Sequence, residues 1–166
     1  MLVGILSDSH DRLDTLNSII DMFHSRGVEA VIHAGDFVAP FTIPHLARLG
    51  VPLYAVKGNN DGEVIGLNTK ITASGGTFST YPLHIELGGR HIFIQHEPFG
   101  LDAPSSKYDL IVYGHTHQQD LRYGSPIILN PGEACGWLTG TASAALYDTE
   151  TQNIEIIEVS LGAAHE

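Results

Sequence analysis

Residue types that bind metal ions follow five apolar runs of this sequence, each at the point where the run ends. The runs are short and continuously apolar, which is typical of strands buried in a sheet. In open α/β sheets, ligands bind just beyond the carboxyl ends of the strands, so side chains at these positions can converge. The polar segments are Ser7-Asp8-Ser9-His10, Gly35-Asp36, Gly58-Asn59-Asn60-Asp61, His96 and Gly114-His115-Thr116-His117.

The combination of imidazole and carboxylate favours a divalent ion of zinc, manganese, iron, cobalt or nickel. Asp8 and His10 are two residues apart, so on an extended chain both would point the same way. The pair His115 and His117 repeats that spacing. Asp36 has two carboxylate oxygens and is the candidate to bridge two ions. Two ions about 3.5–4 Å apart can hold an attacking hydroxide and a phosphoryl oxygen, so we expect a two-metal hydrolytic centre.

The elements that must carry these residues alternate between strand and helix patterns up to residue 56. The helices are predicted from apolar residues at three- and four-residue spacing. This βαβαβ order implies parallel strands with right-handed crossovers. The expected elements are strands at Leu2–Leu6, Val28–His33 and Val51–Val56, and helices at Arg12–Arg26 and Pro40–Leu49.

The remaining sequence changes to hairpin patterns, with only a weak helix or loop signal at residues 62–80. The predicted hairpin connections are Gly88-Gly89, Gly124-Ser125-Pro126 and the segment 148–152. We therefore predict an α/β (mixed α+β) fold, a two-sheet β-sandwich flanked by helices, as one domain over 1–161 with a tail at 162–166. The predicted later strands are Pro82–Leu87, Arg90–Gln95, Tyr108–Tyr113 (after a turn or helix at Ala103–Lys107), Gln119–Tyr123, Ile127–Asn130, Thr141–Tyr147 and Asn153–Val159.

The composition limits the classes of partner. The 166 residues are 43% hydrophobic, enough for a core, and carry a formal charge of −11 from 19 acidic and 8 basic residues. Such a surface repels nucleic acid polymers, so a small phosphoester is the expected substrate. Cys135 is the only cysteine, and no signal peptide or membrane span is evident. We therefore expect a soluble, cytoplasmic protein without membrane partners, whose strand edges could support a homodimer or higher homo-oligomer.

Taken together, the five polar segments resemble the motifs of the calcineurin-like metallophosphoesterases, most of all their small prokaryotic branch. They also resemble the phosphoesterase-fold subunit of retromer, and Asn130-Pro131-Gly132 extends the likeness. The resemblance implies phosphodiester hydrolysis by in-line attack of a metal-bound hydroxide. Manganese is the ion we expect first, with nickel, cobalt, iron or zinc as alternatives. The resemblance further implies that one ion is held by Asp8, His10, Asp36 and His117, and a second ion by Asp36, Asn59, His96 and His115.

Two positions depart from the family pattern. Asn60 stands where larger relatives often have a histidine and small relatives a cysteine. Its amide can hydrogen-bond a phosphoryl oxygen, so we count Asn60 among the catalytic residues, but it cannot act as a general acid. Losing such an acid would cost about 10²–10⁴ in rate, which favours aryl or activated esters as substrates. Glu97-Pro98 follows His96, where many relatives place glycine and another histidine.

Other interpretations of these residues remain open. Asp8 and Asp36 are also common helix caps, and Asn59 after glycine is a common turn residue. Asp61 and His33 are expected to support the ligands from behind, or in the case of His33 to belong to the core. Cys135 is expected to be a structural thiol, and Trp137 and Tyr147 core or interface residues.

Two alternative functions also remain open. The same metal site could hydrolyse phosphomonoesters, because the pocket walls decide that preference. The fold could also serve as a catalytically weak scaffold that binds protein.

Overall fold

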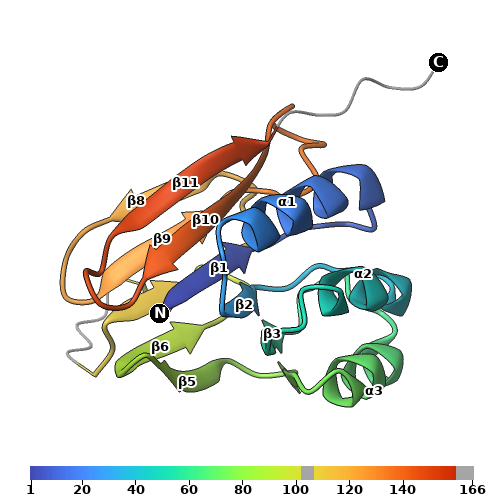
Figure 1. Ribbon diagram of the computed structural model, residues 1–166, viewed down its shortest axis with the longest axis horizontal. Coiled ribbons are helices and arrows are strands. Elements are labelled where there is room, and N and C mark those ends of the chain that lie inside the picture. The colour runs from blue at the N-terminus through green and yellow to red at the C-terminus, as the bar shows by residue number, and fades with distance from the viewer. Residues whose placement is uncertain (102–106, 160–166) are drawn as a thin grey trace.

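The computed structural model describes residues 1–101 and 107–159, which form two sheets and three α-helices in layers (Figure 1). The strand order is β11-β10-β1-β2-β3-β4 in the first sheet and β5-β6-β7-β9-β8 in the second. The helices are α1 (Leu13–Ser25), α2 (Ile43–Ala47) and α3 (Val64–Ala73), with a 3₁₀ turn at Pro40–Thr42. The strands are β1 (Leu2–Leu6), β2 (Ala30–His33), β3 (Leu53–Val56), β4 (Thr77–Ser79), β5 (Leu83–Leu87), β6 (Arg90–Ile94), β7 (Leu110–Val112), β8 (Gln119–Arg122), β9 (Ile127–Pro131), β10 (Ala142–Asp148) and β11 (Ile154–Val159).

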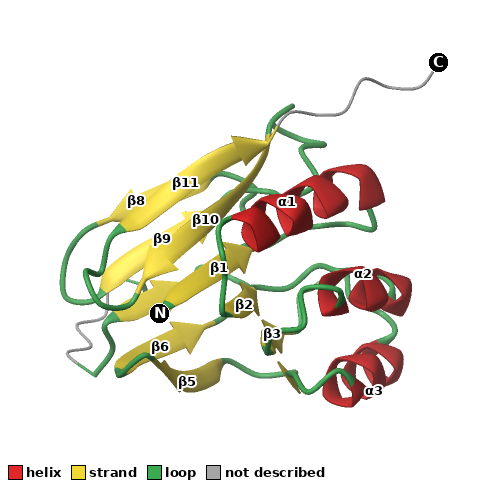
Figure 2. Cartoon of the chain, in the orientation of Figure 1, coloured by secondary structure: helices red, strands yellow, loops and turns green. Residues whose placement is uncertain are grey.

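The helices pack on one face of the first sheet (Figure 2). The amphipathic α1 buries Leu16, Ile19 and Phe23 against strand residues such as Leu6. A Cβ on Gly4 of β1 would lie 2.7 Å from the Phe23 ring, so a glycine here allows the helix to approach the sheet closely. The described helices therefore cover one outer face, whereas the sequence only predicted that helices flank the sandwich.

The other face of the first sheet packs against the second sheet. Their shared core includes Ile5 and Ile32 from the first sheet and Ile94 and Leu129 from the second. Strands β1, β2, β3 and β4 are parallel, and so are β6, β7 and β9. The predicted mixed two-sheet sandwich with an N-terminal βαβαβ unit is thus confirmed.

Several boundaries differ from the predictions. The segment at residues 62–80 forms both α3 and the edge strand β4. The strand predicted at Ile127–Asn130 extends one residue further, because Pro131 also belongs to β9. The turn or helix expected at 103–107 lies almost entirely outside the described residues, as does the 162–166 tail, and the domain boundary at 161 stays a prediction. Among the described residues, no helix is long and apolar enough to cross a membrane.

Candidate metal centre

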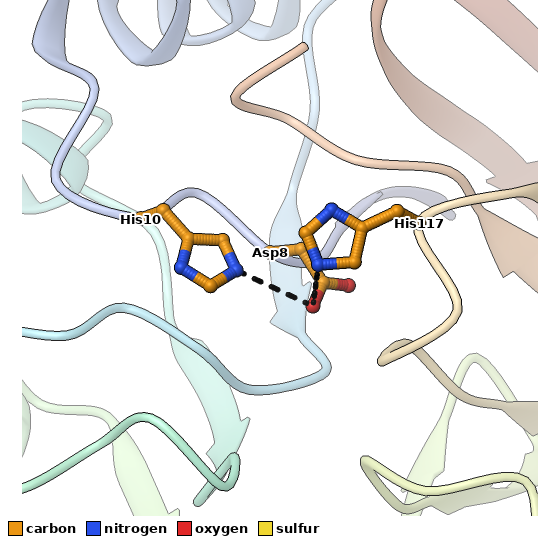
Figure 3. Close-up of side chains that lie close together, drawn as sticks. All are labelled: Asp8, His10 and His117. Atoms are coloured by element: carbon orange, nitrogen blue, oxygen red, sulfur yellow. Dashed lines mark ion pairs between the residues drawn. The ribbon is translucent and has the colours of Figure 1, made fainter. Parts of the chain in front are cut away.

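A first group of predicted ligands meets around one oxygen of Asp8 (Figure 3). The Oδ1 atom of Asp8 lies 3.8 Å from Nε2 of His10 and 3.5 Å from Nε2 of His117. The two rings come from loops far apart in the sequence, and their centroids are 5.1 Å apart. These three side chains could hold one metal ion.

A second group meets around the amide oxygen of Asn59. Its Oδ1 atom lies 2.8 Å from Nε2 of His96 and 2.8 Å from Nδ1 of His115. The other ring nitrogen of His96 lies 2.8 Å from the carbonyl oxygen of Ala34. If Nδ1 donates to that carbonyl, Nε2 keeps its lone pair directed into the site, which a metal ligand requires.

Asp36 connects the two groups. Its Oδ2 atom lies 3.5 Å from Nε2 of His10 and 3.4 Å from Nε2 of His96. Ligand atoms about 2.1 Å from a shared ion at the tetrahedral angle are separated by about 3.4 Å, so these spacings suit coordination. The side chain is only 1% exposed, so a bound cation would be shielded from bulk solvent.

Two polar atoms of the site have no hydrogen-bond partner in the described structure, although both are buried. They are Oδ1 of Asp8 and Nε2 of His10. A buried polar atom without a partner costs roughly 1–3 kcal/mol, more when it is charged. Both atoms belong to the first ligand group and can donate an electron pair, so one divalent cation would satisfy them together.

The backbone at these positions forms tight turns. Positive φ angles occur at Asp8 (53°), His10 (41°), Asp36 (62°), His115 (68°) and His117 (61°). The expectation that residues two apart converge because the chain is extended is therefore wrong, although the side chains do converge. Left-handed turns at the strand ends direct them instead, and Asp and His tolerate that conformation better than most residues.

Asp61 supports the turns that carry Asp36 and Asn59. Its carboxylate accepts hydrogen bonds from the backbone N–H groups of Asp36 (3.1 Å), Val38 (2.7 Å) and Gly58 (2.8 Å). A Cβ on Gly58 would lie 2.1 Å from Oδ1 of Asp36, so only glycine fits there. Asp61 thus lies behind the turns that carry two of the proposed ligands, and its supporting role at a metal centre stays a prediction.

His33 is also held behind the centre and does not join either ligand group. Its Nδ1 accepts from the N–H of Gly35 at 3.2 Å, so Nε2 carries the proton and donates to Oγ of Ser9 at 2.9 Å. The ring stacks on Phe37 with centroids 3.6 Å apart. Burial lowers the pKa of His33 to about 3, which keeps the ring neutral.

Asn60 lies at the exposed edge of the site. Its side-chain amide donates to Oδ2 of Asp36 at 2.7 Å, and its backbone N–H donates to Oδ1 of Asp36 at 2.8 Å. The side chain is therefore within reach of the same carboxylate oxygen that connects the two ligand groups, where it could contact a bound substrate.

The electrostatics of the centre favour a charged Asp36. Burial raises its pKa, but the hydrogen bond and charge of His96 and the two bonds from Asn60 outweigh burial, so the net pKa is lowered. The nearby carboxylate of Asp8, 3.8 Å from the ring nitrogen, raises the pKa of His10. Burial lowers the pKa of His96, yet Asp36 outweighs it and the net shift is upward.

Glu133, which contacts His117 from behind, was not predicted from the sequence. The Glu133 side chain is fully buried, and its Oε2 lies 2.7 Å from Nδ1 of His117. Burial raises the pKa of Glu133, but hydrogen bonds from His117 and Thr139 lower it to a net value of about 2. The only signal in the sequence was its place directly after Asn130-Pro131-Gly132.

Two further residues near Glu133 differ in how well they were predicted. Cys135 is buried, and burial together with Glu133 raises its pKa to about 12, which agrees with a structural thiol. Trp137 is 61% exposed, and its ring centroid lies 6.4 Å from that of His10. Trp137 is therefore not a core residue, which was one of the two roles expected for it. Tyr147, for which the same two roles were expected, is fully buried in the core.

Comparison with known proteins agrees with this site. Residues 1–152 match the calcineurin-like phosphoesterase superfamily domain. A phosphodiesterase of Methanocaldococcus jannaschii is 35% identical over 157 residues, covering 90% of this chain and 94% of that protein. A probable metallophosphoesterase of Methanothermobacter thermautotrophicus is 33% identical over 138 residues, covering 80% of this chain and 76% of that protein.

Solved structures of other proteins are also similar to this chain. An archaeal phosphodiesterase superposes with a TM-score of 0.89 at 33% identity, covering 96% of this chain and 100% of the other. Vacuolar protein sorting 29 of Cryptosporidium parvum shares the fold, with a TM-score of 0.67 at 18% identity over 96% and 98% of the two chains. The family resemblance seen in the motifs is confirmed, and the chain belongs to the calcineurin-like phosphoesterase superfamily.

Proposed function

We propose that this chain is a metal-dependent phosphodiesterase with a dinuclear centre. The observation that carries the proposal is the position of Asp36, whose Oδ2 lies 3.5 Å from His10 and 3.4 Å from His96. One carboxylate oxygen thus stands between two separate ligand groups, as a bridging ligand must. The similarity to an archaeal phosphodiesterase over most of both chains supports the same function.

The donor set suits two divalent ions with mixed nitrogen and oxygen ligands. Manganese remains the first choice, with nickel, cobalt, iron or zinc as alternatives. When bound, such ions supply a nucleophile at neutral pH by lowering the pKa of water, and they stabilise the charge that develops on the phosphoryl group. The first ion would be held by Asp8, His10, Asp36 and His117, and the second by Asp36, Asn59, His96 and His115.

The protein's own groups orient these ligands and the substrate. Glu133 fixes the ring of His117 through Nδ1, and the carbonyl of Ala34 does the same for His96. Asn60 can donate its amide proton to a phosphoryl oxygen but cannot protonate a leaving group. We therefore expect esters with good leaving groups to react best.

The expected substrate is a small diester. The formal charge of −11 repels a nucleic acid polymer, so the local charge of the bound ions must attract the phosphate. Cys135, buried and with a raised pKa, is a poor candidate for an alternative nucleophile. Cys135 is the only cysteine and is a free thiol, which is consistent with a cytoplasmic site of action.

The test is hydrolysis of bis-p-nitrophenyl phosphate and of p-nitrophenyl phosphate by metal-stripped protein, with Mn, Ni, Co, Zn or Mg added back. We expect metal-restored turnover with a preference for the diester. Asp36→Ala and His96→Ala should abolish it, whereas His91→Ala, on the exposed side of β6, should not. Turnover that persists in Asp36→Ala would refute the dinuclear assignment, and a preference for the monoester would refute the diester proposal.

A folded protein that binds no metal and hydrolyses neither ester would instead support the scaffold alternative.

A further inference from the structure

A cavity of about 450 Å³ opens beside the second ligand group. Asn59 and His96 form part of its wall, so the cavity is continuous with the proposed metal centre. Its size is within the range of about 300–1,000 Å³ that small-molecule sites occupy. Whatever is bonded to a phosphate held at the centre can therefore extend into this space.

Two aromatic side chains line this cavity while remaining largely exposed to solvent. Tyr81, between β4 and β5, is 78% exposed, and Phe99, after β6, is 72% exposed. Both backbones are anchored: the N–H of Tyr81 donates to Oγ of Ser79, and the carbonyl of Phe99 accepts from the side chain of Gln95 at 2.9 Å. The backbone is thus held at both positions, and the two aromatic side chains themselves lie open to solvent, where a ligand can reach them.

The polar groups of the same cavity restrict what else can bind. Lys57 and Glu97 both line it, and the ammonium of Lys57 already donates to the carbonyl of Gly58 at 2.8 Å. A carboxylate at Glu97 disfavours a second phosphate and favours a group that donates hydrogen bonds. Two exposed aromatic rings favour a ligand with a flat, apolar surface, because such a surface can stack on them.

We propose that Tyr81 and Phe99 form a subsite that selects phosphodiesters carrying a planar aromatic group, such as a nucleobase or an aryl ring. This inference rests on the proposed phosphodiesterase function and names its substrate class. Phe99 comes directly after Glu97-Pro98, the pair that departs from the family pattern, so this segment carries one of the two aromatic side chains of the cavity. The side chains act on specificity, since neither lies among the proposed ligands.

The test compares the hydrolysis of three diesters by the wild-type protein loaded with Mn. Two are aromatic: bis-p-nitrophenyl phosphate and the p-nitrophenyl ester of thymidine monophosphate. The third is the aliphatic bis(trifluoroethyl) phosphate, from which the release of trifluoroethanol is followed by fluorine NMR. Tyr81→Ala and Phe99→Ala should each lower kcat/KM for both aromatic diesters about tenfold, the equivalent of 1.4 kcal/mol of lost stacking. The value for the aliphatic diester should change less than twofold.

Conservative and distant variants serve as controls. Tyr81→Phe and Phe99→Tyr keep an aromatic ring and should retain the aromatic preference, and Phe41→Ala removes an aromatic side chain that is 47% exposed and is not part of the cavity wall. Circular dichroism checks that the alanine variants fold. A greater loss on the thymidine ester than on the aryl ester would identify a nucleoside as the ligand, and equal losses would identify the ring alone.

The inference and the proposed function fail in different ways. Loss of kcat/KM by the same factor on aromatic and aliphatic diesters, or no loss on any of them, would overturn the aromatic subsite while leaving the phosphodiesterase intact. Absence of turnover on all three diesters by the wild-type protein would instead refute the proposed function.

Discussion

Replacing Glu133 by glutamine tests whether this buried carboxylate positions His117 for metal binding. Glutamine keeps the shape of the side chain but exchanges one acceptor oxygen for an NH₂ donor. In the native protein both carboxylate oxygens face donors only. These donors are Nδ1 of His117, the thiol of Cys135, the backbone N–H groups of Trp137, Leu138 and Thr139, and the hydroxyl of Thr139.

The cost can be worked out from these contacts. If the NH₂ group replaces Oε2, the bonds from His117 (2.7 Å) and from the N–H of Trp137 (3.1 Å) are lost, together with the bond from the Cys135 thiol (3.1 Å), while the N–H of Leu138 keeps its bond to Oε1. At about 1.5–3 kcal/mol for each bond to a charged group, the loss of the His117 and Trp137 bonds would reach about 3–6 kcal/mol, and the thiol, a weak donor, adds little to it. Because Trp137 is 61% exposed and water can replace its bond, we expect a decrease of about 2–4 kcal/mol in the free energy of unfolding.

The effect on metal binding follows from the tautomer of His117. An NH₂ group beside Nδ1 favours a deprotonated Nδ1, which moves the ring proton to Nε2, the atom 3.5 Å from Asp8. A protonated nitrogen cannot coordinate a metal, and changes to such supporting contacts typically cost 10–100-fold in affinity. We therefore expect metal-stripped Glu133→Gln to bind Mn about 10–100-fold more weakly than the wild-type protein.

Titration calorimetry with Mn measures the affinity, and urea denaturation of the metal-free protein measures the stability. Glu86→Gln, on the exposed side of β5, is the matched control and should change neither. If Glu133→Gln folded less stably but bound Mn with wild-type affinity, Glu133 would be a structural residue only, and the tautomer reasoning would be refuted.

Two further predictions concern residues behind the centre. Gly58→Ala would place a Cβ 2.1 Å from Oδ1 and 2.3 Å from the backbone N of Asp36, so the Mn affinity measured by calorimetry should fall at least tenfold. Gly62→Ala is the control and should bind Mn normally, because a Cβ at Gly62 would have no atom within 4 Å. Normal Mn binding by Gly58→Ala would contradict the steric argument. His33 has a folded-state pKa of about 3, below its ordinary 6.5, so its neutral burial contributes stability that is lost as the pH falls from about 6.5 towards 3. Between about pH 6 and pH 5 the metal-free wild-type protein should therefore lose about 1 kcal/mol more unfolding free energy than His33→Gln, measured by urea denaturation, while His24→Gln on the surface of α1 should follow the wild type. Identical pH dependence in the wild type and His33→Gln would show that His33 is not buried neutral.

Much of the fold was predictable because the strands are continuous apolar runs with glycine-rich connections. The helix predicted at Arg12–Arg26 forms as Leu13–Ser25, since its apolar residues at Leu16, Ile19 and Phe23 share one face. The helix predicted at Pro40–Leu49 is instead divided at residue 43. Pro44 has no N–H to donate to the carbonyl of Pro40, so the 3₁₀ turn there closes through the N–H of Ile43.

The segment at residues 62–80 was the least predictable part of the fold. Leu67 and Ile71 are the only buried side chains of α3, so the apolar stripe of this helix is narrow and its sequence signal weak. Strand β4 has three residues, none of them fully buried, and pairs only with β3. Both elements form because they are packed against β3 and α2, which is a tertiary effect that local sequence does not report.

The convergence of the ligand positions followed from their places after strand ends, but the geometry that achieves it did not. Asp8 and His10 lie in left-handed turns, and nothing in their spacing distinguishes such turns from an extended chain. Glu133 was missed for a related reason. Its role depends on contact with His117, sixteen residues earlier, through a ring nitrogen that faces away from the site.

The strained turns explain why the centre needs so many buried hydrogen-bonding side chains around it. Left-handed backbone at a residue other than glycine costs of order 1–3 kcal/mol, and Val38, a β-branched residue with φ of 80°, is among the least favourable cases. The N–H of Val38 donates to Asp61, and Asn130 donates to the carbonyl of Gly114 at 3.0 Å, next to the turn of His115. Such bonds hold the turns in place before any metal binds. The supporting residues should therefore tolerate substitution as poorly as the ligands themselves, because without them the turns would relax and the ligand atoms would separate.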